Sequence, residues 1–256
     1  MFRKLRITIL SIILVFVAVT TWLQNIRSAD WSQTQRVVVY PINGDGDAVT
    51  AEYISNLSRD DFRPIVAYIE RQGKHYELNN PLPLAIDLAP EIDSQPPEIP
   101  DQPGILNAVG WSLSLRYWSW KVENYAGVTP QVRLYLRYFN PKLHPRLKHS
   151  AGLHKGLIGV VQVFASHKMA KTNKVIIAHE MLHTFGASDH YDPATNLPSY
   201  PDGYADPNKE PRYPQDKAEI MGGRIPITST KAVIPKSLSK TLIGPATARE
   251  IHWLND

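Results

Sequence analysis

Two histidines four residues apart, His179 and His183, would lie one turn apart on the same face of an α-helix, where both imidazoles can bind one metal ion. Glu180 would point to the side of that metal, where a carboxylate can accept a proton from a metal-bound water. A four-coordinate site that keeps a position for water needs a third protein ligand. Asp189 could supply it if the chain turns at Gly186, since glycine readily adopts the left-handed conformation just past a helix end.

The helix that must carry these groups is expected to begin near Thr172 or Asn173, because either residue can cap a helix N-terminus. Its buried face is predicted from apolar residues that recur at steps of three and four. The two metal-binding histidines lie on a different face, so the pattern leaves them facing a cleft. The predicted buried residues are Val175, Ala178, Leu182 and Phe185.

Apolar patterns predict the elements that surround this helix. Strands are favoured by alternating or continuous apolar runs, and helices by apolar residues at helical spacing with suitable caps. Three tryptophans, at 111, 118 and 120, lie in a segment whose apolar spacing fits either a strand or a helix. Packing in the core or against a membrane is commoner for such a cluster than stacking on a ligand. The predicted strands are 36–40, 132–139 and 157–164, and the predicted helices are 58–72 and 244–254.

Composition excludes several kinds of site. The 256 residues contain no cysteine, so disulfides, thiolate ligands and a cysteine nucleophile are excluded, and a zinc site must use nitrogen and oxygen ligands. The formal net charge is +4, but four basic residues lie in 1–27, which holds no acid, and the other 24 balance 24 acids. This balance gives no reason to expect a nucleic-acid partner.

The N-terminus predicts a membrane anchor. Residues 7–23 carry no charge and, as a helix, would nearly cross a hydrocarbon core of roughly 30 Å. The basic residues before them favour a cytoplasmic N-terminus and an extracytoplasmic domain. A cleaved signal peptide shares this pattern, and removal of residues 1–29 would give a secreted protein. We favour an uncleaved anchor, because Arg27 interrupts the cleavage frame that ends at Ala29; Trp31 would suit the outer interface.

These observations predict one folded domain on the C-terminal side of the anchor. The expected organisation is a basic cytoplasmic end at 1–6, a transmembrane signal anchor at 7–23, a polar tether at 24–34 and the folded domain at 35–256. Residues 81–103 hold seven prolines and five acids and are expected to form an irregular surface insertion.

The long segment after the metal helix could hold a second metal. Its carboxylate and amide side chains are oxygen ligands of the kind that Ca²⁺ prefers. Their spacing matches no calcium-binding loop, so ordinary turn chemistry is the favoured interpretation. The residues concerned are Asp192, Asn196, Asp202 and Asp206.

Residues 179–189 resemble the zinc-binding motif of the metzincin metallopeptidases, HExxHxxGxxH, with aspartate in the last place as in some members. Met221-Gly-Gly follows where metzincins have their Met-turn, and the resemblance covers about residues 156–256. It implies an α+β fold of the zincin-like, metzincin type: a mixed twisted sheet with an active-site helix, a Met-turn and a C-terminal helix, preceded here by one transmembrane helix. It also implies a single catalytic Zn²⁺ bound by His179, His183 and Asp189, with Glu180 as general base.

Two positions leave alternatives within this resemblance. His190 is an alternative to Asp189 as third ligand, because imidazole is the commoner one. A different zincin arrangement would use a downstream glutamate, Glu210 or Glu219, although both lie in sequence that predicts loops. No tyrosine stands two residues after Met221, where some metzincins have a residue that assists the oxyanion. The tyrosines that could take this role are Tyr200, Tyr204 and Tyr213.

The resemblance implies a membrane-anchored zinc endopeptidase that acts on a peptide or protein in the periplasm or outside the cell. A non-catalytic, zinc-stabilised interaction domain would keep the histidines without needing Glu180, and a zinc amidohydrolase for a non-peptide amide would keep the whole site. In related folds the extended substrate pairs with an edge strand beside the helix. The equivalent residues here are Val160, Val161, Gln162, Val163 and Phe164.

Overall fold

The computed structural model describes residues 30–98, 100, 104–147, 151–152 and 157–254, together with residue 6. The predicted anchor at 7–23 and most of the predicted tether lie outside these residues. Within the described part of the chain, none of the helices combines the length and the apolar character needed to cross a membrane.

A five-stranded sheet forms the centre of the fold, in the order β2-β1-β3-β5-β4. The strands are β1 (Gln35–Asn43), β2 (Leu84–Leu88), β3 (Val132–Phe139), β4 (Ala151–Gly152) and β5 (Ile158–Phe164). The first three and β5 pair in parallel, whereas the short β4 pairs antiparallel to β5. The prediction of a mixed sheet is therefore confirmed, although the sheet is mainly parallel. Strands β3 and β5 are buried almost throughout, as expected of parallel strands covered on both faces.

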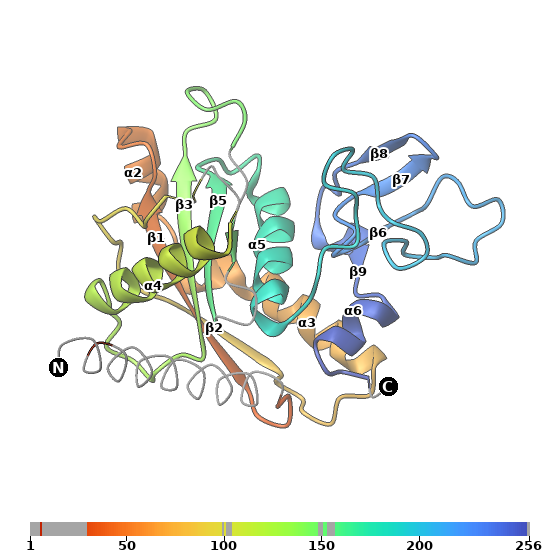
Figure 1. Cartoon of the computed structure of the whole chain (residues 1–256), viewed down its shortest axis with the longest axis horizontal. Coiled ribbons are helices and arrows are strands. Elements are labelled where there is room, and N and C mark those ends of the chain that lie inside the picture. Colours follow the sequence, from red (N-terminus) through yellow and green to blue (C-terminus); the bar gives the residue numbers. More distant parts are fainter. Residues whose placement is uncertain are drawn as a thin grey trace.

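Helices cover the two faces of this sheet (Figure 1). Alternate residues of β1 belong to two apolar cores, one on each face of the sheet. Val37 and Val39 pack with α3 and α5, while Val38 and Tyr40 pack with α4. In Figure 1, α5 lies between the sheet and the C-terminal part of the chain. The helices are α2 (Ala48–Ser55), α3 (Arg63–His75), α4 (Ile105–Lys121), α5 (Ala170–Phe185) and α6 (Pro245–Glu250), with short 3-10 turns at Arg59–Phe62 and Leu238–Lys240.

The C-terminal part contains little regular structure. Two small two-stranded sheets form there, one from β6 (Ala218–Glu219) and β9 (Thr241–Leu242), the other from β7 (Ile225–Thr228) and β8 (Lys231–Val233). The segment between α5 and β6 contains only turns and isolated bridges. The loop-rich excursion predicted after the metal helix is therefore confirmed.

Three expectations were wrong for specific physical reasons. The insertion at 81–103 is not wholly irregular, because Leu84–Leu88 pairs with β1 as an edge strand. Trp31 does not face a membrane interface: it is only 4% exposed, and its indole N–H donates to the Ile251 carbonyl at 2.7 Å. The folded part of the chain therefore includes the end of the predicted tether. The first strand does not end at Tyr40 as predicted: β1 continues to Asn43, with Pro41 in register with Leu136.

Candidate metal centre

The helix that carries the two histidines, α5, begins at Ala170, two or three residues before the predicted start at Thr172 or Asn173. The predicted stripe of apolar residues is buried as expected, including Ala178 and Leu182 at 0% exposure. Asn173 does not cap the helix. Its amide instead donates to the Phe164 carbonyl at 2.7 Å and accepts from the Phe164 N–H at 3.3 Å, which joins α5 to the end of β5.

Gly186 ends the helix as predicted. Its φ of 113° lies in the left-handed region that favours glycine. The next residue, Ala187, donates its N–H to the Leu182 carbonyl at 3.1 Å, which turns the chain back toward the helix. The Ala187 carbonyl then faces Nδ1 of His183 at 2.8 Å. The turn therefore both ends the helix and orients one histidine.

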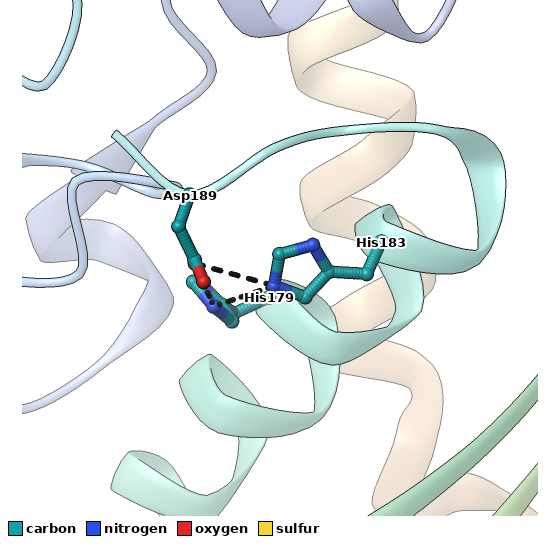
Figure 2. A group of neighbouring side chains, drawn as sticks. All are labelled: His179, His183 and Asp189. Carbon is teal, nitrogen blue, oxygen red and sulfur yellow. Dashed lines mark hydrogen bonds and ion pairs between the residues drawn. The ribbon is translucent and has the colours of Figure 1, made fainter. Parts of the chain in front are cut away.

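Three ligand atoms converge above α5. The Nε2 atoms of His179 and His183 lie 3.2 Å apart, and Oδ1 of Asp189 lies 3.1 Å from the first and 3.2 Å from the second. Figure 2 shows the Asp189 side chain pointing from the loop after α5 toward both imidazoles. These atoms are close enough together to share one metal ion. The predicted third ligand is thus brought to the histidine pair.

The other nitrogen of each imidazole faces a backbone carbonyl. His179 Nδ1 lies 2.9 Å from the Ile220 oxygen, and His183 Nδ1 lies 2.8 Å from the Ala187 oxygen. A carbonyl can only accept, so each Nδ1 donates to its carbonyl, and each Nε2, on the side of Asp189, is the atom that could bind a metal. This arrangement of outer hydrogen bonds is the one that orients histidines as metal ligands. The donor set therefore fits a metal ion.

The loop that carries Asp189 is held on both sides. The Ser188 N–H donates to Oε2 of Glu250 at 2.8 Å, and the His190 N–H donates to the Met221 carbonyl at 2.9 Å. The imidazole of His190 instead lies near two glutamates. Its Nε2 lies 3.4 Å from Glu250, and its Nδ1 lies 3.8 Å from Glu219. The geometry therefore places Asp189, and not His190, at the third position.

Glu219 is occupied elsewhere in the structure. Its side chain is fully buried and accepts hydrogen bonds from the N–H groups of Met221 at 2.7 Å and Gly222 at 2.8 Å. Its other oxygen accepts from the Gly244 N–H and the Thr247 hydroxyl at the start of α6. Glu219 thus holds the turn around Met221 and is not available as a metal ligand, while Glu210 lies exposed in the loop.

The chain makes a tight turn at Met221, the residue predicted to form a Met-turn. Gly223 donates to the Glu219 and Ile220 carbonyls, both at 3.2 Å, and has a φ of 70°. Met221 is 0% exposed and belongs to the main apolar core. The Ile220 carbonyl of this turn is the one that orients His179. Residues some forty positions apart thereby meet at one side of the site.

Electrostatic interactions favour an ionised Asp189. Burial opposes its charge, but hydrogen bonds and charge interactions with His179 and His183 hold the pKa of its carboxyl well below the usual range. Burial likewise opposes a charged His179, yet Asp189, Glu180 and the Ile220 carbonyl together raise the pKa of His179 to about 9. The pocket between these side chains therefore favours a positive charge, which suits a cation.

A cleft of about 270 Å³ opens beside the candidate ligands. Its walls include His179 and Glu180 from α5 and Gly222, Gly223 and Arg224 from the segment after Met221, together with apolar side chains. The apolar part of the wall comprises Phe164, Met169, Val175, Ile176, Ile220 and Ile234. Of the two histidines predicted to face a cleft, His179 lines this one together with Glu180, whereas His183 does not.

Tyr191 is the tyrosine at this site, although the sequence suggested others. It lines the cleft, and its ring lies 6.4 Å from that of His179. Burial and a hydrogen bond with Asp189 raise the pKa of Tyr191 to about 12, so the phenol keeps its proton. Tyr204 and Tyr213 instead pair with each other at 2.9 Å, and Tyr200 lies under the Arg212 guanidinium. Tyr191 lies two residues after Asp189 in the sequence, and this closeness to the predicted third ligand could have identified it.

The predicted substrate strand is the penultimate strand of the sheet. The two residues of β4 pair with Gly159 and Val160, while Val161–Phe164 extend beyond that pairing. At the far end, the Phe164 main chain is bonded to the Asn173 amide. Of the five predicted residues, Phe164 alone lines the cleft. Whether this strand binds a substrate stays a prediction.

Two of the four residues considered as calcium ligands form local turns, as the sequence favoured. Asp192 accepts from the Ala194 N–H at 2.8 Å, and Asp206 accepts from the Asn208 N–H at 3.2 Å, both two residues ahead. Apart from the group at His179, no cluster of three His, Asp or Glu side chains that could hold a metal occurs in the described residues. A calcium ion is therefore not proposed.

Two imidazole nitrogens and one carboxylate oxygen match the ligand sets of catalytic zinc sites, which use three protein ligands and leave a fourth position open. Neither a scan against protein-family models nor a search of curated proteins gives a match for this chain. The chemistry of the site must therefore be inferred from its own residues.

Proposed function

We propose that this protein is a zinc-dependent endopeptidase of the metzincin type, held at a membrane by its N-terminal segment. One observation carries the proposal: His179, His183 and Asp189 bring one ligand atom each to the same point, and His179 also lines a cleft whose wall includes Glu180. A purely structural metal site has no need of an open cleft or of an adjacent carboxylate. The combination therefore favours catalysis over a zinc-stabilised interaction domain.

Zinc is the metal that the donor set fits best, because nitrogen and oxygen ligands in a three-residue set are typical of hydrolytic zinc sites. A zinc ion held by these residues would lower the pKa of a water molecule toward neutrality and polarise the carbonyl under attack. The carbonyls of Ile220 and Ala187 keep both imidazoles in the tautomer that this role requires.

Glu180 would act as the general base. It follows His179 on α5 and lines the same cleft, so its carboxylate can accept the proton of the attacking water and return it to the leaving amine. Tyr191 keeps its phenolic proton and can donate a hydrogen bond to the oxygen that becomes negative when the carbonyl is attacked. The two residues together cover proton transfer and charge stabilisation.

The walls of the cleft could contact an apolar side chain of a peptide substrate. Val175, Ile176 and Ile220 supply an apolar surface next to the metal ligands. Arg224 stands at the same cleft, where its guanidinium can pair with a substrate carboxylate or carbonyl. These walls support a peptide substrate in preference to a small amide, which would leave most of this surface uncovered.

The deciding experiment compares the full-length chain with Glu180→Gln, both purified in detergent and loaded with zinc, on a peptide library. The wild type should cleave peptide bonds, and the variant should lose activity by about a hundredfold or more while it keeps one zinc. Zinc content measured on the same samples controls for loss of the site.

The alternatives give different results. Equal inactivity of both proteins, with one zinc bound to each, would support a non-catalytic domain. Hydrolysis of small acylated amines by the wild type, without cleavage of any peptide, would support an amidohydrolase. A Glu180→Gln variant as active as the wild type would remove Glu180 from the mechanism.

A further inference from the structure

Helix α4 presents an apolar stripe to solvent. Four large side chains on it are exposed: Val109 by 51%, Leu113 by 46%, Tyr117 by 65% and Trp120 by 75%. They recur at steps of four, four and three, which places them along one face of the helix. Of the exposed large hydrophobic residues in the described part of the chain, these four share a single helix.

The opposite face of α4 is already used in the core. Leu115 is fully buried, and Trp118 packs edge-on against Tyr135 with ring centroids 4.7 Å apart. The Ser119 hydroxyl lies 2.7 Å from the Tyr135 hydroxyl, and the Trp118 indole donates to Ser94 at 2.9 Å. The helix is therefore apolar on both sides. A helix of this kind is expected between two apolar environments, one of which is the sheet.

Charge and aromatic content indicate the second environment. The 17 residues of α4 include two cations, Arg116 and Lys121, and no acid. Tyr and Trp are the side chains enriched where a protein meets a bilayer, because their rings enter the headgroup region while their polar atoms stay hydrated. A cationic, acid-free helix with exposed Tyr117 and Trp120 therefore complements an anionic lipid surface.

The sequence before the described part brings the domain close to such a surface. The uncharged segment 7–23 is predicted to be a membrane anchor, and Trp31 is fixed in the core through Ile251. Fully extended, the residues between 23 and 31 span less than about 30 Å. A domain on so short a tether must stay near the bilayer, which favours lipid over a distant protein partner.

We propose that the exposed face of α4 docks on the surface of the membrane that holds the anchor. Val109 and Leu113 would contact the acyl boundary, while Tyr117 and Trp120 would lie at the headgroups. The domain would then be held by two contacts, the anchor and α4, and would keep one orientation relative to the bilayer. This inference rests on the proposed membrane anchor and does not depend on the proposed peptidase activity.

The absence of cysteine allows a direct test. Single substitutions Leu113→Cys and Tyr117→Cys in the full-length chain can each carry a spin label, with Val49→Cys on α2 as the control because Val49 is similarly exposed, at 52%. The labelled proteins are reconstituted into vesicles of phosphatidylcholine and phosphatidylglycerol. Accessibility is then measured to oxygen, which concentrates in lipid, and to a nickel chelate, which stays in water.

The labels at 113 and 117 should show a several-fold higher ratio of oxygen to nickel accessibility than the label at 49. The difference should shrink when phosphatidylglycerol is omitted, since anionic lipid attracts the cations of α4. Equal accessibility at all three positions would overturn the proposal. Dipolar broadening between labels at 113 would also overturn it, because it would mean that α4 packs against a second copy of the chain.

Discussion

The carboxylate of Glu219 accepts a hydrogen bond of 2.7 Å from the main-chain N–H of Met221. Through its other oxygen, the same side chain holds the start of α6 at Gly244, 2.9 Å away. The turn at Met221 orients His179 through Ile220, and α6 carries Glu250, which holds the Asp189 loop at Ser188. One buried carboxylate therefore supports both sides of the candidate metal centre.

We predict that Glu219→Gln weakens both folding and metal binding. The amide would face N–H donors with an N–H₂ group, so the free energy of unfolding should fall by about 2 kcal/mol. Zinc affinity should fall by about tenfold, as expected when a group behind the ligands is lost. Urea denaturation and a competitive zinc titration measure the two effects. Glu210→Gln, at an exposed loop position, should change neither; equal effects of both substitutions would contradict the role of Glu219.

We predict that Asp189→Ala loses zinc. The change removes the one anionic ligand, so affinity should fall by at least about a hundredfold, measured as zinc retained after dialysis against a weak chelator. Asp192→Ala, which removes a nearby exposed carboxylate, should retain zinc. His190→Gln should also retain it, because the His190 imidazole faces Glu219 and Glu250. Loss of zinc from His190→Gln alone would reassign the third ligand.

We predict that Tyr191→Phe slows turnover without removing zinc. Loss of the phenolic proton removes one hydrogen bond to the developing negative charge, so kcat should fall by about tenfold to a hundredfold while KM changes little. Steady-state kinetics on a cleaved peptide, with zinc content measured in parallel, test this. Tyr200→Phe, at a position 51% exposed, is the matched control. A rise in KM alone would indicate that Tyr191 binds substrate and does not stabilise charge.

We predict that Asp45 makes stability depend on pH in the acid range. Burial opposes its charge, but the N–H groups of Asn140 at 2.6 Å and Asp47 at 3.1 Å outweigh burial and lower the pKa of Asp45 below its ordinary value. Because the folded state has the lower pKa, this stabilisation is present above the unfolded-state pKa and is lost as pH falls through the folded-state pKa.

Asp45→Asn should therefore lower the free energy of unfolding by about 1 to 2 kcal/mol at pH 7, and by progressively less as the pH approaches 2. Urea denaturation of both proteins across this pH range gives the difference directly. Asp60→Asn is the control, because the Asp60 side chain is 77% exposed. A difference between wild type and Asp45→Asn that stays constant with pH would show that the effect comes from packing and not from charge.

Local patterns predicted the elements that depend on local interactions. Strand β3 has the predicted bounds, and α5 carries the predicted apolar stripe and ends at Gly186, because side-chain periodicity and glycine conformation act within a few residues. The edge strand β2, which pairs with β1, was not predicted. The prolines on either side of it made the segment resemble a loop. Pairing to a distant strand overrode the local composition.

By itself, the sequence specified His179, Glu180 and His183 as a group, because four residues of helix bring two imidazoles to one face whatever surrounds them. The choice of Asp189 over His190 and Glu219 depended on contacts that span 30 to 60 residues: Met221 with His190, Glu250 with Ser188, and Ile220 with His179. The same is true of Tyr191, whose place at the cleft follows from the path of that loop. Adjacent residues in a loop can point in opposite directions, and only the packing of the segments around them selects which one faces the metal centre.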